Sequence, residues 1–282
     1  CFFSRKKFVT TFHGTYNFSG KFKHFYNSVM VRSKLIIGGS NFIFNHINAK
    51  YQKYLNPKKK KLMVIFRGIN LEYFNTINTS EKRTNILISS WKIDKKKFII
   101  LLPGRLTKWK GQEIFIESLS LLIEKYNNEN FHAIILGSDQ GREVYSKKLE
   151  LLVERHRLRK KITFIESCKE MPLAYKLSDL VISSSIEPEA FGRVAVEAQA
   201  MKKPIIASDI GGSRETVLNG KSGLLYKYND KKELAKSINK IMGMNKISLS
   251  QMGDQGRKNV EKKFNVDQMC QSTFTEYKKI LK

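Results

Sequence analysis

Two glutamates, Glu189 and Glu197, have the side-chain type and the spacing that most clearly suggest chemistry. They lie in the stretch from Ser183 to Gly212, with a Pro-marked polar loop before Glu189 and a helix-like run rich in Ala and Val around Glu197. The amides that begin such a helix form an anion site, and Gly192 lets a ligand approach the backbone closely. A carboxylate in an apolar setting needs a bound partner, so Glu197 is a candidate for binding hydroxyl groups. The alternative is that Glu189 only favours the helix dipole and that Glu197 faces solvent.

A basic loop from Gly104 to Gly111 is the second candidate. It joins an apolar run to a helix-like segment, and it carries Arg105 and Lys110. Fixed positive charge at a strand end suits a diphosphate group, and Arg offers bidentate geometry that Lys does not. The other interpretation is an ordinary basic loop in a basic protein.

Short apolar runs alternate with helix-like segments along most of the chain, and both candidate groups follow such runs. Strands separated by crossover helices indicate parallel sheets, in which ligands bind at the carboxyl ends of the strands. Two blocks of this alternation predict an α/β fold of two domains. The predicted strands are Phe8–Phe12, Leu35–Gly38 and Leu62–Phe66 in the first block, and Phe98–Leu102, His132–Leu136, Ile162–Ile165, Leu180–Ser183, Pro204–Ala207 and Gly223–Tyr226 in the second.

The domain boundaries follow from where this alternation stops. Residues 75–97 have weak periodicity and many polar side chains, so we expect an interdomain linker there. Residues 1–74 then form a first, partial domain and residues 98–264 form the second domain. Residues 265–282 predict a final helix.

The composition is strongly basic, with 52 Lys and Arg against 25 Asp and Glu and a net charge of +27. Such a charge favours nucleic acid, an anionic membrane surface or a phosphate-bearing substrate, although a lysine-rich proteome would also produce it. A nucleic-acid-binding protein predicts clustered cations with interleaved aromatics, whereas most cations here are dispersed lysines. The three cysteines are too widely spaced for a disulfide framework or a metal site. No apolar run is long enough to span a membrane, so any membrane contact is expected to be peripheral.

Six motifs, in order, resemble those of the retaining glycosyltransferases of family 4. That family has the GT-B fold, in which two Rossmann-like domains with parallel sheets face each other across a cleft. The motifs are Thr11–Gly14, Arg67–Asn70, Arg105 with Lys110, Glu189 with Glu197, Gly211–Glu215 and Asn219–Gly223.

The resemblance implies roles for individual residues. Glu189 would contact the transferred sugar, and His13 would face it across the cleft, so these two are the implied catalytic residues. Glu197 would bind the ribose, and the nucleotide base would lie near Glu166–Cys168, where many relatives have Gly in place of Glu166. The full set of implied donor-binding residues is Gly104, Arg105, Lys110, Ser167, Cys168, Phe191, Gly192, Arg193, Val194 and Glu197.

The function implied by the resemblance is retaining transfer of a hexose-type sugar from a nucleotide-diphosphate sugar. The expected acceptor is a hydroxyl of a cell-envelope glycan or glycolipid, similar to a lipopolysaccharide core. The chain contains no Asp-x-Asp pair, so protein cations are expected to replace a metal, and we expect neither metal nor other cofactor. A cytoplasmic location is expected, with peripheral contact at the inner face of the cytoplasmic membrane and no nucleic-acid partner.

The sequence is also compatible with other functions. A nucleotide-sugar epimerase or a phosphorylase of the same fold, and a non-catalytic nucleic-acid-binding protein, are the alternatives. Relatives place a Gly-rich loop and several strands before the equivalent of Phe8, and the chain begins with Cys rather than Met. We therefore expect the sequence to be N-terminally truncated and its first domain to be incomplete.

Overall fold

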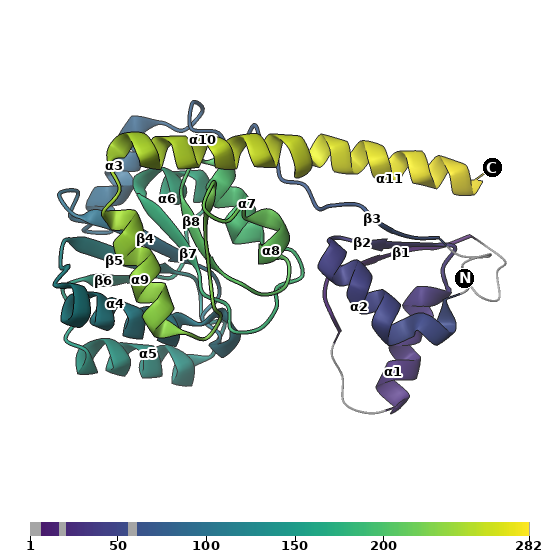
Figure 1. Cartoon of the computed structure of the whole chain (residues 1–282), viewed down its shortest axis with the longest axis horizontal. Helices are drawn as coiled ribbons and strands as arrows, with labels where there is room; N and C mark the ends of the chain where they lie inside the picture. Colours follow the sequence, from purple (N-terminus) through teal and green to yellow (C-terminus); the bar gives the residue numbers. More distant parts are fainter. Residues whose placement is uncertain (1–6, 17–20, 56–60, 282) are drawn as a thin grey trace.

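A computed structural model describes residues 7–16, 21–55 and 61–281 of the protein. Parts of the predicted first domain (1–6, 17–20 and 56–60) and the last residue of the predicted final helix lie outside these ranges. Two parallel sheets organise the described part of the chain (Figure 1), as the sequence predicted. All nine predicted strands are present, with ends that differ by at most two residues.

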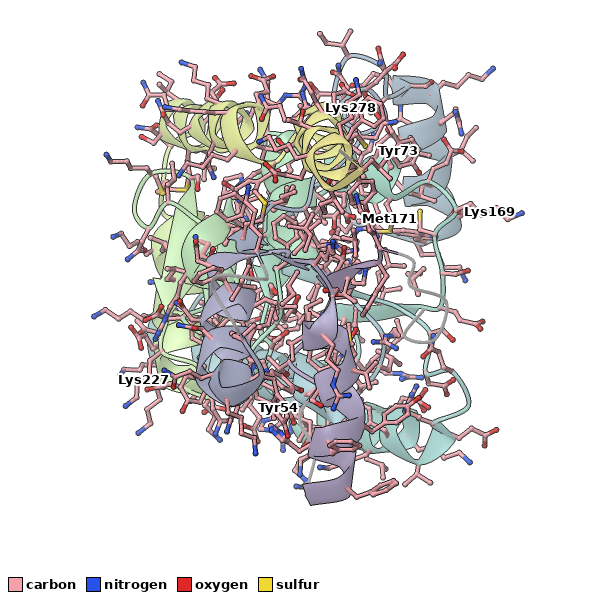
Figure 2. All side chains as sticks on the ribbon, turned by 90° about the vertical axis from the view of Figure 1, so that its right-hand side faces the viewer. Tyr54, Tyr73, Lys169, Met171, Lys227 and Lys278 are labelled. Carbon is pink, nitrogen blue, oxygen red and sulfur yellow. The ribbon has the colours of Figure 1, made fainter. Side chains whose placement is uncertain are left out.

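The first sheet has the order β1-β2-β3, formed by β1 (Val9–Phe12), β2 (Leu35–Gly38) and β3 (Lys61–Val64). Helices α1 (Lys21–Asn27) and α2 (Asn41–Tyr51), with 3-10 turns at Ser28–Arg32 and Gln52–Tyr54, connect the strands. Figure 2 looks onto this domain and shows the two helices below the sheet. Ser40 caps α2, because its hydroxyl accepts from the amide of Ile43.

The second sheet has the order β6-β5-β4-β7-β8-β9. Its strands are β4 (Phe98–Pro103), β5 (Phe131–Leu136), β6 (Ile162–Ile165), β7 (Leu180–Ser183), β8 (Ile205–Ser208) and β9 (Gly223–Tyr226). The helices that connect its strands are α4 (Gln112–Tyr126), α5 (Glu143–Arg155), α6 (Met171–Leu177), α7 (Arg193–Ala200) and α8 (Ser213–Thr216), and α9 (Lys231–Met242) and α10 (Lys246–Lys263) follow the last strand.

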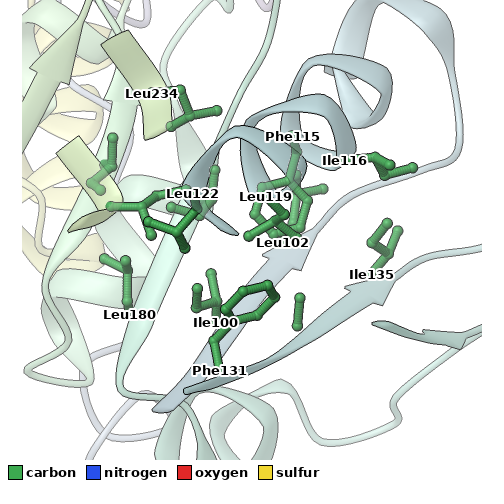
Figure 3. Packing of buried hydrophobic residues seen from close by; sticks show 14 of the residues in the cluster. Ile100, Leu102, Phe115, Ile116, Leu119, Leu122, Phe131, Ile135, Leu180 and Leu234 are labelled. Carbon is green, nitrogen blue, oxygen red and sulfur yellow. The ribbon is translucent and has the colours of Figure 1, made fainter. Parts of the chain in front are cut away.

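Burial on both faces explains why these strands read as continuous apolar runs. Every residue of β5, β7 and β8 is buried, which is typical of parallel strands covered by helices on both sides. On one face, Phe115, Leu119 and Leu122 of α4 pack over Ile100 and Phe131 (Figure 3). This core fixes the strand ends from which the candidate loops emerge.

Residues 75–97, where we expected a linker, instead contain helix α3 (Glu81–Ser90) and pack on the second domain. Ser80 caps this helix, which lies against α6. Ile93 is buried in the same cluster as residues of β4 and α7. The segment looked like a linker because few of its side chains are apolar, and of these only Leu87, Ile88, Trp91 and Ile93 belong to or pack on that cluster, while Ile77 and Ile86 are exposed.

The final helix, α11 (Val266–Leu281), returns to the first sheet (Figure 1). Its Met269 and Ile280 pack with Leu35 and Ile37 of β2. Where α11 begins, the two segments that pass between the domains are hydrogen-bonded: the amide of Ile69 donates to Phe264 O at 2.9 Å, and the amide of Val266 donates to Ile69 O at 3.1 Å. The domains are therefore joined by two adjacent chain segments.

Candidate functional site

The two loops singled out in the sequence come together at the carboxyl edge of the second sheet. The loop that follows β4 and the loop that follows β7 leave neighbouring parallel strands. The amide of Ile186 in one loop donates to the carbonyl of Trp109 in the other at 2.8 Å. This is the edge at which open α/β sheets bind their ligands.

Glu189 lies in direct contact with Lys110. Lys110 Nζ is 2.7 Å from Glu189 Oε1, and only 14% and 10% of these side chains are exposed. The hydroxyl of Ser185 donates to the same carboxylate oxygen at 2.5 Å, and Lys110 Nζ lies 4.3 Å from the centroid of the Trp109 ring. A buried charge needs such compensation, so the cation and the carboxylate of the predicted site neutralise each other here.

Glu197 has the bound partners that its apolar setting predicted. The phenol of Tyr175 donates to Glu197 Oε2 at 2.8 Å, and Arg193 Nε donates to Glu197 Oε1 at 2.6 Å. Burial, followed by the charge of Glu197, raises the pKa of Tyr175 well above its ordinary value. Tyr175 therefore stays protonated and acts as a hydrogen-bond donor to Glu197 at neutral pH.

The start of α7 lies between the two carboxylates. Gly192 is its N-cap and has a left-handed φ of 83°, while Phe191 is buried against Phe264. The first amide of the helix that donates to the carbonyl of Gly192 is that of Ala195. The amides of Arg193 and of the half-buried Val194 come before it in the first turn. Amides in this position are the ones that helices use to bind anions.

Arg105 and Gly104 complete the basic loop. The Arg105 side chain is exposed, and its carbonyl accepts from Gln112 Nε2 at 2.8 Å. Gly104 lies beside the aliphatic part of Lys110, since a Cβ at Gly104 would be 3.6 Å from Lys110 Cδ. The structure thus gathers Gly104, Lys110 and Glu189, and it leaves the Arg105 guanidinium accessible.

Ser167 and Cys168 lie farther along the same edge, in the loop after β6. Strand β6 is three places from β7 in the sheet, a separation of about 14 Å at usual strand spacing. The Cys168 thiol donates to Glu170 O at 3.3 Å, and burial raises its pKa. The structure does not bring this pair into contact with Glu189 or Glu197, and the assignment to a nucleotide base stays a prediction.

His13 follows β1 in the first domain and has an exposed side chain. Partial burial of the ring, and then the positive charge of Arg67, lower the pKa of His13, so it is neutral at pH 7. Arg67 also lines a cavity of about 390 Å³ together with Tyr73, Phe191 and Arg193. A segment of the first domain therefore shares a cavity with the start of α7, while the catalytic role of His13 stays a prediction.

Two residues in contact with the carboxylates were missed in the sequence. Ser185 lies within the stretch singled out above, and its signal was a row of three serines that begins at the last residue of a strand. Tyr175 is on α6, 22 positions before Glu197, and its local pattern indicated only a short helix. No signal in the sequence distinguishes it from a core tyrosine.

Neither a metal-binding cluster nor a membrane-spanning helix is found among the described residues. Within the ranges given above, no group of three or more His, Cys, Asp or Glu is placed to hold a metal ion. None of the helices described is long and apolar enough to cross a membrane.

Curated relatives of this chain include several glycosyltransferases. The chain is 26% identical over 253 residues to spore coat protein SA of Bacillus subtilis (strain 168), covering 86% of this chain and 64% of the relative. It is 29% identical over 197 residues to a D-inositol 3-phosphate glycosyltransferase of Corynebacterium urealyticum, covering 69% of this chain and 46% of the relative. The chain thus spans less than two thirds of the length of these relatives.

Solved structures match nearly the whole chain. A glycosyltransferase from Rickettsia africae ESF-5 is 33% identical with a TM-score of 0.88, covering 98% of this chain and 71% of that one. Alr3699/HepE of Anabaena, solved with UDP and glucose, has a TM-score of 0.85 at 24% identity, covering 99% of this chain and 73% of that one. The second likeness shows the fold alone. Together they confirm the predicted GT-B architecture of two Rossmann-like domains with parallel sheets.

The family model described as glycosyl transferases group 1 matches residues 84–259. This range contains the basic loop, both glutamates and the Gly-Gly motif, and it covers more than half of the chain. The match confirms the resemblance that the six motifs indicated. This protein belongs to the glycosyl transferases group 1 family.

Proposed function

We propose that this protein transfers a hexose-type sugar from a nucleotide-diphosphate sugar to a hydroxyl group of an acceptor, with retention of the anomeric configuration. The observation that supports this most directly is the buried contact between Lys110 and Glu189 beside the start of α7. It places a cation, a carboxylate and free helix amides within one small region. Family membership and the UDP and glucose held by Alr3699/HepE support a donor of this class.

Donor binding requires an exchange of partners. The diphosphate would be held by Arg105, Lys110 and the amides of Arg193 and Val194. Because Lys110 is now bound to Glu189, its movement toward the diphosphate would release the Glu189 carboxylate to accept hydroxyl groups of the sugar. Glu197, held by Tyr175, would bind the ribose diol in place of its present contact with Arg193.

The chemistry follows from where charge develops. The bond between the anomeric carbon and the diphosphate oxygen breaks, its electron pair goes to the diphosphate, and the sugar gains oxocarbenium character. Arg105, Lys110 and the helix amides stabilise the growing negative charge, which is preorganised electrostatic catalysis. The acceptor oxygen attacks from the face that the diphosphate leaves, and its proton passes to a donor phosphate oxygen.

Protein cations would serve where other glycosyltransferases use a metal. The support is the absence of an Asp-x-Asp pair in the sequence and the convergence of Arg105 and Lys110 on one loop. We expect transfer to continue at the same rate after dialysis against EDTA, as measured by release of the nucleoside diphosphate. Loss of activity on chelation, with recovery on adding a divalent ion, would show that this part of the proposal is wrong.

The acceptor would be a cell-envelope glycan or glycolipid at the inner face of the cytoplasmic membrane. One relative, 27% identical over 231 residues, is the capsular polysaccharide biosynthesis glycosyltransferase CapM of Staphylococcus aureus. A second support is charge: residues 1–71 contain 14 Lys and Arg and no Asp or Glu. Anionic lipid attracts such a surface with about 1 kcal/mol per cation close to it.

Exposed apolar side chains lie on the same basic domain. Phe22 and Tyr26 on α1 are 84% and 71% exposed, and Phe25 and Val29 beside them are also exposed. The Arg32 guanidinium lies 5.2 Å from the centroid of the Phe25 ring. Aromatic side chains among cations are suited to the interface of an anionic bilayer, so we assign peripheral membrane contact to this helix.

One binding experiment tests the donor site. UDP, GDP and ADP, alone and as their hexose conjugates, are titrated calorimetrically into the wild type, Glu197→Ala and Glu150→Ala. Glu150 is an exposed glutamate on α5 and serves as the control. We expect one nucleotide series to bind the wild type and Glu150→Ala equally and Glu197→Ala at least about tenfold more weakly. The donor site is wrong if no nucleotide binds or if Glu197→Ala binds as well as the wild type.

A further inference from the structure

A single carboxylate of the second domain caps a helix of the first. Glu215, on α8, accepts from the amides of Asn41 and Phe42 at 2.8 and 2.6 Å, and from Asn41 Nδ2 at 2.8 Å. The two amides belong to the first turn of α2, where amide groups have no partner inside the helix. A carboxylate at this end of a helix is stabilised by both hydrogen bonds and the helix dipole. The contact therefore joins the domains through charge-assisted hydrogen bonds.

Ser40, the cap residue of α2, contacts the loop that carries Glu189. Its hydroxyl accepts from Ile43 N at 3.1 Å and donates to Ala190 O at 2.5 Å. Ala190, the residue after Glu189, also packs on the hydrophobic cluster of the first domain. The first domain thus holds the Glu189 loop from one side.

The segment just before α8 holds this loop from the other side. The amide of Gly212 donates to Glu189 O at 2.8 Å. Gly211 has φ of +56°, and a Cβ there would lie 2.6 Å from Glu189 O. The backbone of residues 189–190 is therefore enclosed between the start of α2 and the Gly-Gly pair, three and four positions before Glu215.

A cleft of about 670 Å³ adjoins the contact and is lined by α2, by residues 186–188 and by the α8 region, including Glu215. The domains are therefore not packed continuously here, and the contacts beside the cleft include the hydrogen bonds of Glu215 and Ser40 and the packing of Ala190. Polar interdomain contacts of this kind form and break as domains move. Glu215 and Ser40 are thus placed to respond to the relative position of the domains.

We propose that Glu215 and Ser40 form an interdomain clamp that holds the domains together and positions Glu189 for sugar transfer. The clamp acts through the backbone of residues 189–190, so both are positioning residues and neither touches the substrate. The inference rests on the proposed function only where it refers to transfer. Its geometric part, the coupling between Glu215 and domain position, can be measured without any substrate.

The first measurement is an interdomain distance in the full chain. Spin labels are attached at Lys53→Cys and Lys221→Cys, two exposed positions in different domains, after the three native cysteines are replaced by serine. We expect one narrow distance in the wild type, a longer and broader distribution in Glu215→Ala and an intermediate one in Glu215→Gln, whose amide keeps one acceptor oxygen. Glu233→Gln is the matched control, because Glu233 also accepts from a backbone amide, Lys227 N at 2.9 Å, but within its own domain.

The second measurement separates positioning from binding. Misplacement of a reacting group by 1 Å costs about 10²-fold in rate, so we expect Glu215→Ala to lower kcat by about tenfold to a hundredfold. The dissociation constant of whichever of UDP, GDP or ADP binds the wild type should stay within about threefold, because the donor contacts lie on the second domain. A residue with only a structural role would lower the melting temperature and donor affinity along with kcat.

The outcomes separate the clamp from the proposed function. An unchanged distance distribution in Glu215→Ala, or normal kcat in that variant of an active enzyme, overturns the clamp and leaves the function standing. If the wild type transfers no sugar but Glu215→Ala still alters the distance, the clamp stands and the proposed function fails. Should Glu215→Ala not fold, the comparison of Glu215→Gln with Glu233→Gln decides the question in the same way.

Discussion

At the scale of single residues, the carboxylates of the proposed donor site are paired with cations of the same site. Lys110 binds Glu189, and Arg193 binds Glu197, with distances of 2.7 and 2.6 Å. Each pair joins groups that the family resemblance assigns to one ligand. Each of these two cations is therefore neutralised by a carboxylate in the structure.

Tyr175 supports the more buried carboxylate of the two pairs, and its substitution gives a direct prediction. Tyr175→Phe removes one hydrogen bond to Glu197 and leaves Oε2 without that donor, while the ring still fills its place. A hydrogen bond to a charged group is worth about 1.5–3 kcal/mol, so nucleotide affinity should fall by about tenfold or more in calorimetry. Tyr226→Phe, which removes a buried phenol that accepts from Ser208, should leave affinity unchanged. Equal affinity in Tyr175→Phe and the wild type would show that the phenol does not set the position of Glu197.

Residue types and spacing predicted two candidate groups, Arg105 with Lys110 in the loop after one strand and Glu189 with Glu197 in the loop and helix after another, and the family resemblance joined them in one site. The contact of Lys110 with Glu189 agrees with that grouping. Tyr175 could not be found in this way, since its contact depends on how α6 packs against α7. Periodicity describes which face of a helix is buried, but it does not show which side chain on that face meets a carboxylate.

At the scale of elements, the Gly-Gly segment before α8 sets the position of the Glu189 loop. Gly211→Ala should displace residues 188–191, because its Cβ would lie 2.6 Å from Glu189 O and φ is positive. Gly220→Ala is the control, since Gly220 also has positive φ (+76°) but a Cβ there would meet nothing within 4 Å. Positive φ costs about 1–3 kcal/mol in either variant, so both should lose stability in thermal unfolding, and Gly211→Ala should lose more because its Cβ also clashes with the Glu189 backbone.

Only Gly211→Ala should lose sugar transfer, by about tenfold or more, because only that variant moves the loop. The rate of nucleoside diphosphate release, measured for both variants, tests this difference. Equal rates in the two variants would mean that the close approach at Gly211 does not position Glu189.

The strands were predictable from sequence because parallel strands buried on both faces leave continuous apolar runs such as Ile134–Leu136. Helix α3 was not, since only a few of its side chains face α6 and the rest are polar. The four-residue helix α8 was also missed, because it is too short to show a period. Both failures concern elements whose structure depends mainly on tertiary contacts.

At the scale of the whole molecule, charge is divided unevenly between the domains. All 25 Asp and Glu lie after residue 71, so membrane binding should depend on the first domain. We expect the protein to sediment with vesicles of phosphatidylcholine and phosphatidylglycerol, but not with phosphatidylcholine alone, and added salt should release it.

Matched variants test which surface of the protein binds the vesicles. Phe22→Ser with Tyr26→Ser should weaken vesicle binding by at least about tenfold, because each buried ring contributes over 1 kcal/mol. Ile77→Ser, at a position that is 88% exposed outside the first domain, should have no effect. If the protein binds a DNA or RNA oligonucleotide but not anionic vesicles, the assignment of membrane contact to α1 is wrong.

The packing of α11 on the first sheet makes the unfolding free energy of the protein depend on pH. Hydrogen bonds from Lys279 and Lys61 lower the pKa of the Glu276 carboxyl. A lowered folded pKa contributes stability that is complete above the unfolded value of about 4.3 and is lost as pH falls through the folded value. We expect the difference in unfolding free energy between the wild type and Glu276→Gln to be constant near pH 7 and to shrink below about pH 4.3. Urea unfolding at a series of pH values measures this difference in unfolding free energy. A difference that grows on acidification would contradict the lowered pKa of Glu276.

The paired connections at Ile69 and Val266 have a mechanical consequence. Two chain segments cross between the domains side by side and are hydrogen-bonded to each other. We expect this pair to act as a hinge that is stiffer than a single flexible linker. Gly68 tightens it, since a Cβ there would lie 2.4 Å from Val266 Cα. We expect such a hinge to favour one rotation over sliding and twisting, so that opening and closing would bring α2 back to Glu215 in the same register.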